Sequence, residues 1–162
     1  MNRTQLEHEL NALHPQSFGW ALTCCQRDES LARDVLQQAY LKVLEGKAQF
    51  RGQSSFKTWF FAVLRFTAID QMNQKARSAK QQAFIEQGQY WQAETQEPMD
   101  WSALRQAIAD LPAKQRDVLH LVFYQELTLD EAAQVMQVSP GTVRQHYHRA
   151  KAKLKKQLQA KR

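Results

Sequence analysis

Apolar residues recur along this chain at spacings of three and four, and no alternating apolar and polar pattern of the kind that predicts β-strands persists. Five glycines and four prolines leave few turn signals to interrupt the pattern. The predicted helices fall into two unequal groups, residues 1–78 and 100–162. We therefore expect an all-α fold of two small helical domains, an N-terminal helical bundle and a C-terminal four-helix domain, joined by a flexible linker at 79–99.

In the first group, Asp28 is a candidate cap for a helix whose buried stripe steps by four. That stripe consists of Leu31, Val35, Ala39 and Val43, with Leu36 alongside. A second face of the same helix, at i, i+3, i+4 and i+7, consists of Asp34, Gln37, Gln38 and Leu41. This mixed polar and apolar face is either simply solvated or a binding surface, and the residues alone leave both interpretations open.

The segment 50–55 is a predicted loop, with a turn glycine at Gly52 and a capping Ser55, and it precedes a helix that starts at Phe56. The predicted buried side of this helix consists of Phe56, Trp59, Phe60 and Val63. Phe61 lies about 100° from its neighbour and cannot join all of them, so we expect an exposed aromatic. Cations and an amide follow at Arg65, Asn73, Lys75 and Arg77. Aromatics interleaved with cations favour single-stranded nucleic acid, although most of these aromatics are expected to form the core.

In the second group, Leu104, Ile108 and Leu111 define a helix that ends at Pro112, and Val118, Leu119 and Leu121 define the next one. Thr128 is a candidate cap for a short helix that runs to about Met136, and Gln137 and Val138 form a turn. Ser139 followed by Pro140 is a strong start signal for the last helix. A short helix, a turn and an amphipathic helix predict a helix-turn-helix.

The last helix has a predicted inward stripe of Val143, Tyr147, Ala150 and Leu154. Its other side consists of Thr142, Gln145, Arg149 and Lys156, flanked by Arg144, His146, His148 and Lys153. We expect this side to enter a major groove, where Gln145 can pair with adenine and Arg149 with guanine or a phosphate. The two histidines are expected to be surface or groove-edge residues without a metal.

The formal charge of +6 is unevenly distributed. From Gly141 onward there are eight basic residues and no acidic residue, which is typical of a surface that binds polyanions. The stretch 79–99 is rich in glutamine and carries about −2, whereas the two groups that flank it are basic. This change in composition is the reason for placing the linker there.

Other kinds of chemistry have little support in the sequence. The adjacent Cys24 and Cys25 lie in an apolar stretch and are expected to be core thiols, and with His8 and His14 they match no zinc pattern. The acidic residues form no catalytic constellation, so we do not expect an enzyme. The longest apolar run, 59–64, is too short to span a bilayer and no secretory signal is seen, so we expect a soluble cytoplasmic protein without membrane insertion.

Several runs, taken in order, resemble the extracytoplasmic-function (ECF) sigma factors of bacterial RNA polymerase. These runs are Asp34-Val35-Leu36-Gln37, Phe50-Arg51-Gly52, Ser54-Ser55-Phe56-Lys57-Thr58-Trp59, Ala68-Ile69-Asp70, Leu111-Pro112, and Gly141-Thr142-Val143-Arg144 with Arg149-Ala150. Each run is weakly specific, but their order and spacing over residues 11–158 are highly specific. The resemblance implies a sigma region 2-like domain at 1–78 and a region 4-like domain at 100–162.

The resemblance also implies partners and site residues. Core RNA polymerase would bind the face that consists of Asp34, Gln37, Gln38 and Leu41. Promoter opening and recognition of the unpaired −10 strand would involve Phe50, Arg51, Ser54, Ser55, Trp59, Phe61, Arg65, Asn73, Lys75 and Arg77. The −35 element of double-stranded promoter DNA would be read by Thr142, Arg144, Gln145, His146, His148, Arg149, Lys153 and Lys156. Many members of the family also have an anti-sigma factor.

The chain departs from the family pattern at five positions. The family often has an acid at Arg33, Asn at Phe66, Arg at Gln74, Gly at Gln137 and Arg at His146. Gln137 implies a strained or altered turn, because a glycine tolerates positive φ better than glutamine does. The alternative function is a helix-turn-helix regulator with a helical sensing or dimerisation domain, which accounts for residues 100–162 but not for the aromatic and basic helix at 56–77.

Overall fold

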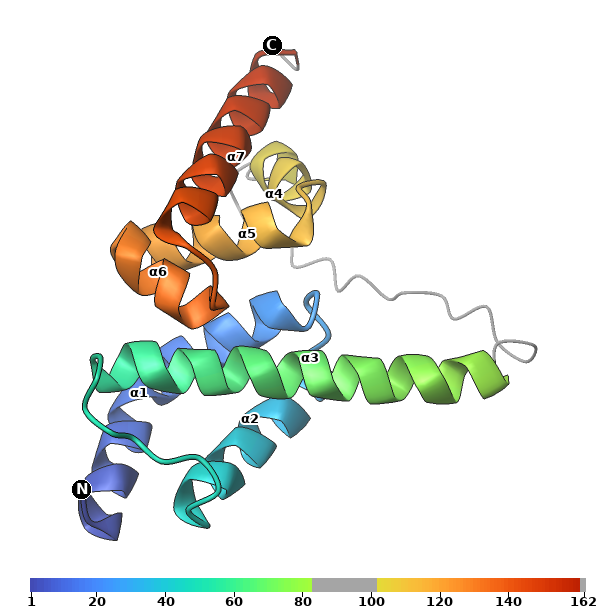
Figure 1. The fold of residues 1–162 in the computed structure, drawn as a ribbon. Coiled ribbons are helices and arrows are strands. Elements are labelled where there is room, and N and C mark those ends of the chain that lie inside the picture. Colours follow the sequence, from blue (N-terminus) through green and yellow to red (C-terminus); the bar gives the residue numbers. More distant parts are fainter. Residues whose placement is uncertain (83–101, 161–162) are drawn as a thin grey trace.

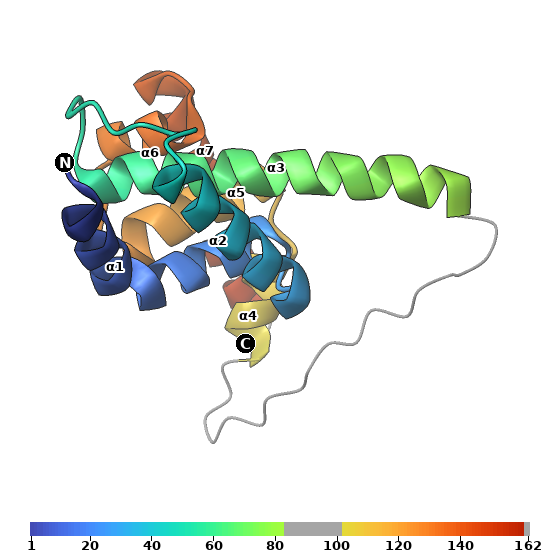
Figure 2. The ribbon, with the colours of Figure 1, turned by 90° about the horizontal axis from the view of Figure 1, so that it is seen from below.

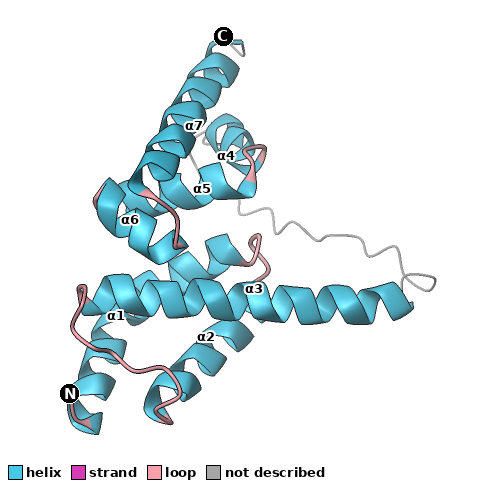
Figure 3. Ribbon diagram, in the orientation of Figure 1, coloured by secondary structure: helices cyan, strands magenta, loops and turns pink. Residues whose placement is uncertain are grey.

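The computed structural model describes residues 1–82 and 102–160, and in these ranges the regular structure is entirely helical (Figures 1 and 3). The helices are α1 (Arg3–Cys24), α2 (Glu29–Leu44), α3 (Phe56–Gln82), α4 (Ser102–Ala109), α5 (Ala113–Leu119), the π-helix η1 (His120–Tyr124), α6 (Leu129–Met136) and α7 (Pro140–Ala160). The predicted all-α fold of two helical domains is confirmed.

The predicted helix starts in the first domain are confirmed by their hydrogen bonds. An oxygen of the Asp28 carboxylate accepts from the Leu31 amide at 3.1 Å, and the Ser55 hydroxyl accepts from the Thr58 amide at 3.1 Å. Each bond satisfies one of the amides that the first turn of a helix leaves unpaired. These two caps determine where α2 and α3 begin.

α3 is the central helix of the first domain, and it lies across both α1 and α2 (Figures 1 and 2). The predicted stripe of α2, from Leu31 to Val43, is buried, as are Phe56 and Phe60 of α3. α3 continues to Gln82, so the first four residues of the stretch predicted as linker, 79–82, are helical. The rest of that stretch lies outside the described residues.

In the second domain, Pro112 separates α4 from α5, and α5 passes into η1 without a break. α6 starts in a capping box, in which Thr128 and Glu131 each accept the other's backbone amide at 3.1 Å. Gln137 then adopts the left-handed conformation with φ of 54°, which confirms the strained turn expected where the family has glycine. Ser139 caps α7 by accepting from the Thr142 amide at 3.1 Å.

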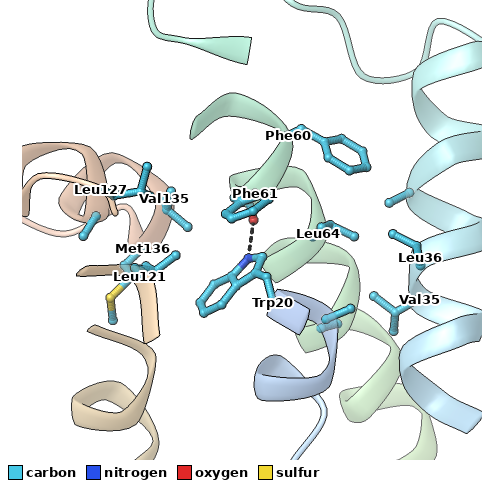
Figure 4. Packing of buried hydrophobic residues seen from close by; sticks show 14 of the residues in the cluster. Trp20, Val35, Leu36, Phe60, Phe61, Leu64, Leu121, Leu127, Val135 and Met136 are labelled. Carbon is cyan, nitrogen blue, oxygen red and sulfur yellow. Dashed lines mark hydrogen bonds between the residues drawn. The ribbon is translucent and has the colours of Figure 1, made fainter. Parts of the chain in front are cut away.

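One apolar core crosses both domains (Figure 4). Trp20 of α1 is fully buried between Phe61 of α3 and the second domain, and its indole N–H donates to the Phe61 carbonyl at 3.0 Å. Leu121 and Met136 contribute to this same core from the second domain. Among the described residues, the separate core of the second domain has three buried members, Leu111, Leu119 and Ala150. The second domain therefore buries much of its apolar surface against the first.

Candidate nucleic-acid and polymerase interfaces

The outer side of α7 is a basic surface that no other described element covers. Val143 and Ala150 are fully buried, Tyr147 and Leu154 are half-buried, and together they attach α7 to α4, α5 and α6. The opposite side is exposed at Arg144, Gln145, His148, Arg149, Lys153 and Lys156. The side chains predicted for base and phosphate contacts are thus available to a ligand at the end of the helix-turn-helix.

Two residues predicted for the same surface are less available. The Thr142 hydroxyl lies 2.8 Å from the Ser139 hydroxyl, as part of the cap of α7. His146 is half-buried, and its Nδ1 is buried without a hydrogen-bond partner among the described residues. Burial, with smaller contributions from Lys114 and Arg149, lowers the pKa of His146 and so favours the neutral ring. His146 thus lies at the edge of the exposed surface.

The loop 50–55 and the start of α3 form an aromatic cluster. The Phe50 ring lies 5.5 Å from Phe56 and 5.4 Å from Trp59 between centroids, and Phe50 and Trp59 are both half-buried. Gly52 has φ of +73°, a conformation that L side chains rarely adopt. Arg51 is exposed at the outer edge of the loop. The packed aromatic rings therefore hold a loop whose cation faces solvent.

The structure divides the α3 residues predicted for promoter opening between two sides of the helix. Asn73, Lys75 and Arg77 are exposed. Phe61 is fully buried against Trp20, with 6.1 Å between ring centroids, so the prediction that it is the exposed aromatic is wrong. Phe61 turns toward α1 because α3 packs on two partners, and its residues some 100° apart are buried by different helices. The exposed aromatic of α3 is Phe66, at 66% relative exposure.

A polar groove of about 380 Å³ runs between α2 and the C-terminal half of α3. It is lined by Asp34, Gln37, Gln38, Gln71, Gln74, Lys75 and Ser78. All of its α2 residues belong to the face predicted to bind a partner, and Leu41 on that face is 54% exposed. This face is therefore open and combines an acid, two amides and an apolar side chain.

Polar contacts hold the second domain against α3. The Lys57 ammonium donates to the Gln125 carbonyl at 2.6 Å, and the Thr58 hydroxyl donates to the Glu131 carboxylate at 3.3 Å. Burial lowers the pKa of Lys57, while Glu126 and Glu131 act in the opposite direction. Lys57 and Thr58 are therefore committed to the contact between the domains and are not free for DNA in this arrangement.

Arg65, which was predicted to act in promoter opening, forms an ion pair with Asp117 of α5 at 3.8 Å. Both side chains are largely buried, at 19% and 12% exposure. Burial raises the pKa of Asp117 to about 6, although Arg65 and Arg116 favour its ionised form. The pair therefore joins the domains through a carboxylate that ionises less readily than an exposed one.

His120 of η1 is a further link between the domains. Its ring stacks on Trp20 at 5.6 Å between centroids, its Nδ1 lies 3.1 Å from the Thr23 hydroxyl, and its Nε2 lies 3.0 Å from the Gln125 amide nitrogen. Thr23 donates onward to the Gly19 carbonyl, so we assign the proton to Nδ1 and leave Nε2 to accept from Gln125. Burial, with Arg27 adding to it, lowers the pKa of His120 to about 4. The network accommodates only the neutral ring.

The two cysteines are both free thiols at the end of α1. Cys25 is buried and burial raises its pKa to about 11, while burial raises the pKa of Cys24 well above its ordinary value. Thiols with raised pKa values are poor nucleophiles and poor metal ligands. Within the described ranges, no three or more His, Cys, Asp or Glu side chains are arranged to hold a metal ion.

Comparisons with known proteins assign both domains. The family model for sigma-70 region 2 matches residues 10–78, and that for sigma-70 region 4 matches residues 107–156. The chain is 32% identical to RNA polymerase sigma factor YlaC of Bacillus subtilis over 78% of this chain and 77% of that protein. It is 31% identical to the RNA polymerase sigma-H factor of Pseudomonas aeruginosa over 82% and 75%.

The chain belongs to the sigma-70 family of RNA polymerase sigma factors. Its similarity to ECF sigma factor SigX of Bacillus subtilis, at 28% identity over 82% of this chain and 73% of that protein, places it in the ECF subgroup. As a sigma factor it takes part in transcription initiation by directing RNA polymerase to promoters. The region 2 match covers the aromatic and basic helix at 56–77, which the alternative of a helix-turn-helix regulator did not explain.

A solved structure with the same fold is the sigma factor RpoE from Bartonella quintana in complex with the anti-sigma factor NepR. Its TM-score is 0.77 at 24% identity, and the match covers 98% of this chain and 99% of that chain. In the described part of this sigma factor, no helix is long and apolar enough to cross a membrane.

Two features of this sigma factor were missed in the sequence. Phe66 occupies a position where the family often has Asn, and that departure was the available signal for an exposed aromatic. The packing between the domains has no local signal, because the residues that meet are far apart in sequence: Arg65 pairs with Asp117, and Trp20 stacks on His120. Asp117 is the one hint, because it directly precedes the apolar Val118 and Leu119 of α5, and an acid that is buried with them needs a positive partner.

Proposed function

We propose that the outer side of α7 reads the −35 element in double-stranded DNA, and that the free side of α3 with the loop 50–55 recognises the unpaired −10 strand. The observation that supports the first assignment best is the exposed basic side of α7, with Gln145 at its centre. Cations there can neutralise phosphates while Gln145 forms paired hydrogen bonds to a base edge. The role assigned to α3 rests on exposed Asn73, Lys75 and Arg77 in its C-terminal half and on the packed aromatic cluster at its start.

We infer that core RNA polymerase binds the α2 face that includes Asp34, Gln37, Gln38 and Leu41. All four are exposed, and no other described element covers them. In this proposal the sigma factor performs no catalysis of its own, and the polymerase supplies all of the chemistry. An anti-sigma factor is part of the same proposal, because a solved structure with this fold, RpoE, is in complex with the anti-sigma factor NepR, and another, CnrH, is in complex with the cytosolic domain of CnrY.

The packed arrangement of the domains cannot engage both promoter elements at once. α6 contacts both α3 and α7, so the axes of these two helices are at most about 20 Å apart where they approach most closely. The position numbers −10 and −35 place the two elements about 25 base pairs apart, which is roughly 85 Å of B-DNA. We therefore infer that the domains separate on the promoter. A chain of 19 residues, the number between Gln82 and Ser102, can reach at most about 65 Å, and the domains themselves span the remainder.

The test is transcription in vitro by purified core polymerase on a library of genomic promoters, with and without the sigma factor. We expect transcripts that depend on it and that share one upstream and one downstream motif. A variant with Asp34→Ala and Gln37→Ala should bind core polymerase more weakly while its helicity stays unchanged, because both side chains are exposed. Asp130→Ala with Gln134→Ala, which removes an exposed acid and an exposed amide from α6, is the matched control. Unchanged affinity for core polymerase would refute the assignment of the α2 face.

Replacing the loop 50–55 separates two steps of initiation. We expect closed complexes to form and strand opening to fail, because the loop is assigned to the unpaired strand and not to duplex binding. Permanganate reactivity of thymines reports opening, and gel retardation at low temperature reports the closed complex. Loss of both together would mean that the loop is structural.

A further inference from the structure

Phe66 lies on the side of α3 that faces away from the second domain. Trp59, Phe66, Asn73 and Arg77 are spaced by seven, seven and four residues, so they form one line along the helix. Trp59 is half-buried and the other three are exposed. The contacts to the second domain, through Thr58 and Arg65, lie on a different side. The line is therefore open even when the domains are packed together.

The position of a cation distinguishes Phe66 from an ordinary exposed apolar residue. Single exposed apolar side chains are common and need no explanation by themselves. Here the Lys42 ammonium of α2 lies 5.6 Å from the Phe66 ring centroid and also donates to the Thr67 hydroxyl at 3.1 Å. That hydrogen bond holds the cation beside the ring. An aromatic face and a fixed positive charge are thus presented together.

We propose that Phe66 stacks on an unpaired base of the opened promoter strand while Lys42 pairs with a neighbouring phosphate. The proposal rests on the function proposed for α3. Every base has a π-face and every phosphate a negative charge, so a ring beside a cation fits a single strand. Phenylalanine has no hydrogen-bonding group with which to read a base edge in a groove. A paired base in a duplex would moreover hide its face from the ring.

The charges around Phe66 agree with this ligand. Lys42 lies at the ring and Arg77 lies farther along the same line, while Asp70 is an exposed acid one turn from Phe66. Farther along the exposed part of α3, Lys75 and Arg77 are not matched by another acid, so cations outnumber acids along this side of the helix, as a polyanion requires. The competing occupant is core polymerase, because Leu41 is also exposed on α2. The test therefore measures polymerase binding and base stacking separately.

The experiment uses holoenzyme and a promoter that the wild-type sigma factor opens. 2-Aminopurine, a fluorescent base that stacking quenches, is placed at one position at a time along the opened non-template strand. Phe66→Ala removes the ring, Phe66→Leu keeps an apolar side chain without a planar face, and Phe66→Trp keeps the planar face. Phe123→Ala is the matched control, because Phe123 is an exposed phenylalanine of the second domain at 60% exposure.

We expect quenching at one position with the wild type and Phe66→Trp, and its loss with Phe66→Ala and Phe66→Leu. Open complexes formed by these two variants should be about tenfold less stable, as expected from the loss of one stacked base. Affinity for core polymerase, closed-complex formation and all properties of Phe123→Ala should match the wild type. Wild-type quenching with Phe66→Leu would overturn the proposal, and so would a tenfold loss of polymerase affinity with Phe66→Ala. A wild-type protein that opens no promoter would instead refute the proposed function.

Discussion

The two long helices that carry many of the basic residues, α3 and α7, differ in how much of their surface the rest of the molecule covers. α3 contacts α1, α2 and α6, so its N-terminal half is covered on most sides, while the line through Phe66 and most of the helix from Asn73 to Ser78 are exposed. α7 contacts α4, α5 and α6 on one side and is exposed on the other. Cations of α3 such as Lys57 and Arg65 bind the second domain, whereas Arg144 and Arg149 of α7 remain exposed.

This difference separates two uses of positive charge. On α7 the cations face solvent, where a phosphate backbone can replace water without any rearrangement of the protein. On the covered side of α3 the cations offset buried carbonyl and carboxylate groups, and they become available only if the domains separate. Substitutions on the covered side of α3 should therefore change stability and domain contact, whereas substitutions on the exposed side of α7 should change DNA binding alone.

The largest effect is expected for Trp20→Ala, which removes the side chain shared by α3 and the second domain. Trp20 is fully buried and contacts both Phe61 and His120. Truncating a buried tryptophan costs about 3 to 5 kcal/mol of unfolding free energy, which urea denaturation followed by circular dichroism measures. The free energy of unfolding of Phe66→Ala, on the open side of α3, should stay within about 0.5 kcal/mol of the wild-type value. Equal losses for both variants would contradict the division of α3 into a covered and an open side.

A smaller effect is expected for Arg65→Ala, which leaves the buried carboxylate of Asp117 without its nearest counter-charge. Because Arg116 also stabilises the ionised form of Asp117, we expect the free energy of unfolding to fall by only about 2 kcal/mol at pH 7. Adding Asp117→Asn should recover part of this loss, since the uncompensated charge is then gone. Arg77→Ala, an exposed cation of the same helix, is the matched control. A double variant less stable than Arg65→Ala alone would contradict the role of the ion pair.

Acidification should act on the domain contact through two groups of opposite sign. The pKa of His120 is lowered to about 4 from an ordinary 6.5, so the packed form loses stability as the pH falls from 6.5 toward 4. The pKa of Asp117 is raised to about 6 from an ordinary 3.8, so the packed form is favoured as the pH falls from 6 toward 3.8. The two effects oppose each other between pH 6 and 4.

Variants that keep only one of these groups separate the two effects. With Asp117→Asn, lowering the pH from 7 to 5 should destabilise the packed form by about 1 to 2 kcal/mol, because only His120 then titrates in the contact. With His120→Gln the same change should favour the packed form. Urea midpoints across this pH range, with small-angle X-ray scattering to follow domain separation, give the measurement. The same sign in both variants would refute the assignment of the two groups.

The prediction from sequence succeeded where a local signal determines the structure. The caps at Asp28, Ser55 and Thr128 and the buried stripe of α2 follow from residues close together in the chain, and all are confirmed. The left-handed turn at Gln137 followed from a single departure from the family pattern. In each case the interacting groups are within about one helical turn, so the sequence specifies them directly.

The prediction failed for Phe61 because the side of a helix that is buried depends on its tertiary partners. Periodicity identifies an apolar stripe on a helix. α3 is buried on two sides by different helices, so its stripe is wide. A wide stripe does not indicate which aromatic side chain is exposed to solvent. The pairing of Arg65 with Asp117 joins residues 52 positions apart and has no local signal. The roles of the α2 face and of the α7 surface remain predictions, since ligand contacts are determined by the partner.

The smallest effects on the protein itself are expected on α7, where base reading and charge attraction can be told apart. Gln145 and Lys156 are both exposed and eleven residues apart, about three turns along the helix. Gln145→Ala should relax base preference at one upstream position by about 1 kcal/mol. Lys156→Ala should weaken binding to all DNA sequences alike. It should also reduce the slope of log affinity against log salt concentration by about one, because one phosphate contact is lost.

The comparison requires that neither substitution alters the packing of the domains, so unfolding midpoints should match the wild type within error. Binding is best measured with holoenzyme, because the packed arrangement of the free protein holds the second domain against α3. The affinity of each variant is measured at several salt concentrations for a library of promoters that differ in the upstream element. Each variant then gives both a base preference and a salt slope. A change of base preference with Lys156→Ala, or a uniform loss with Gln145→Ala, would mean that α7 meets the groove with a different side. In that case its interior contacts through Val143 and Ala150 would still hold, because they depend on the protein and not on the DNA.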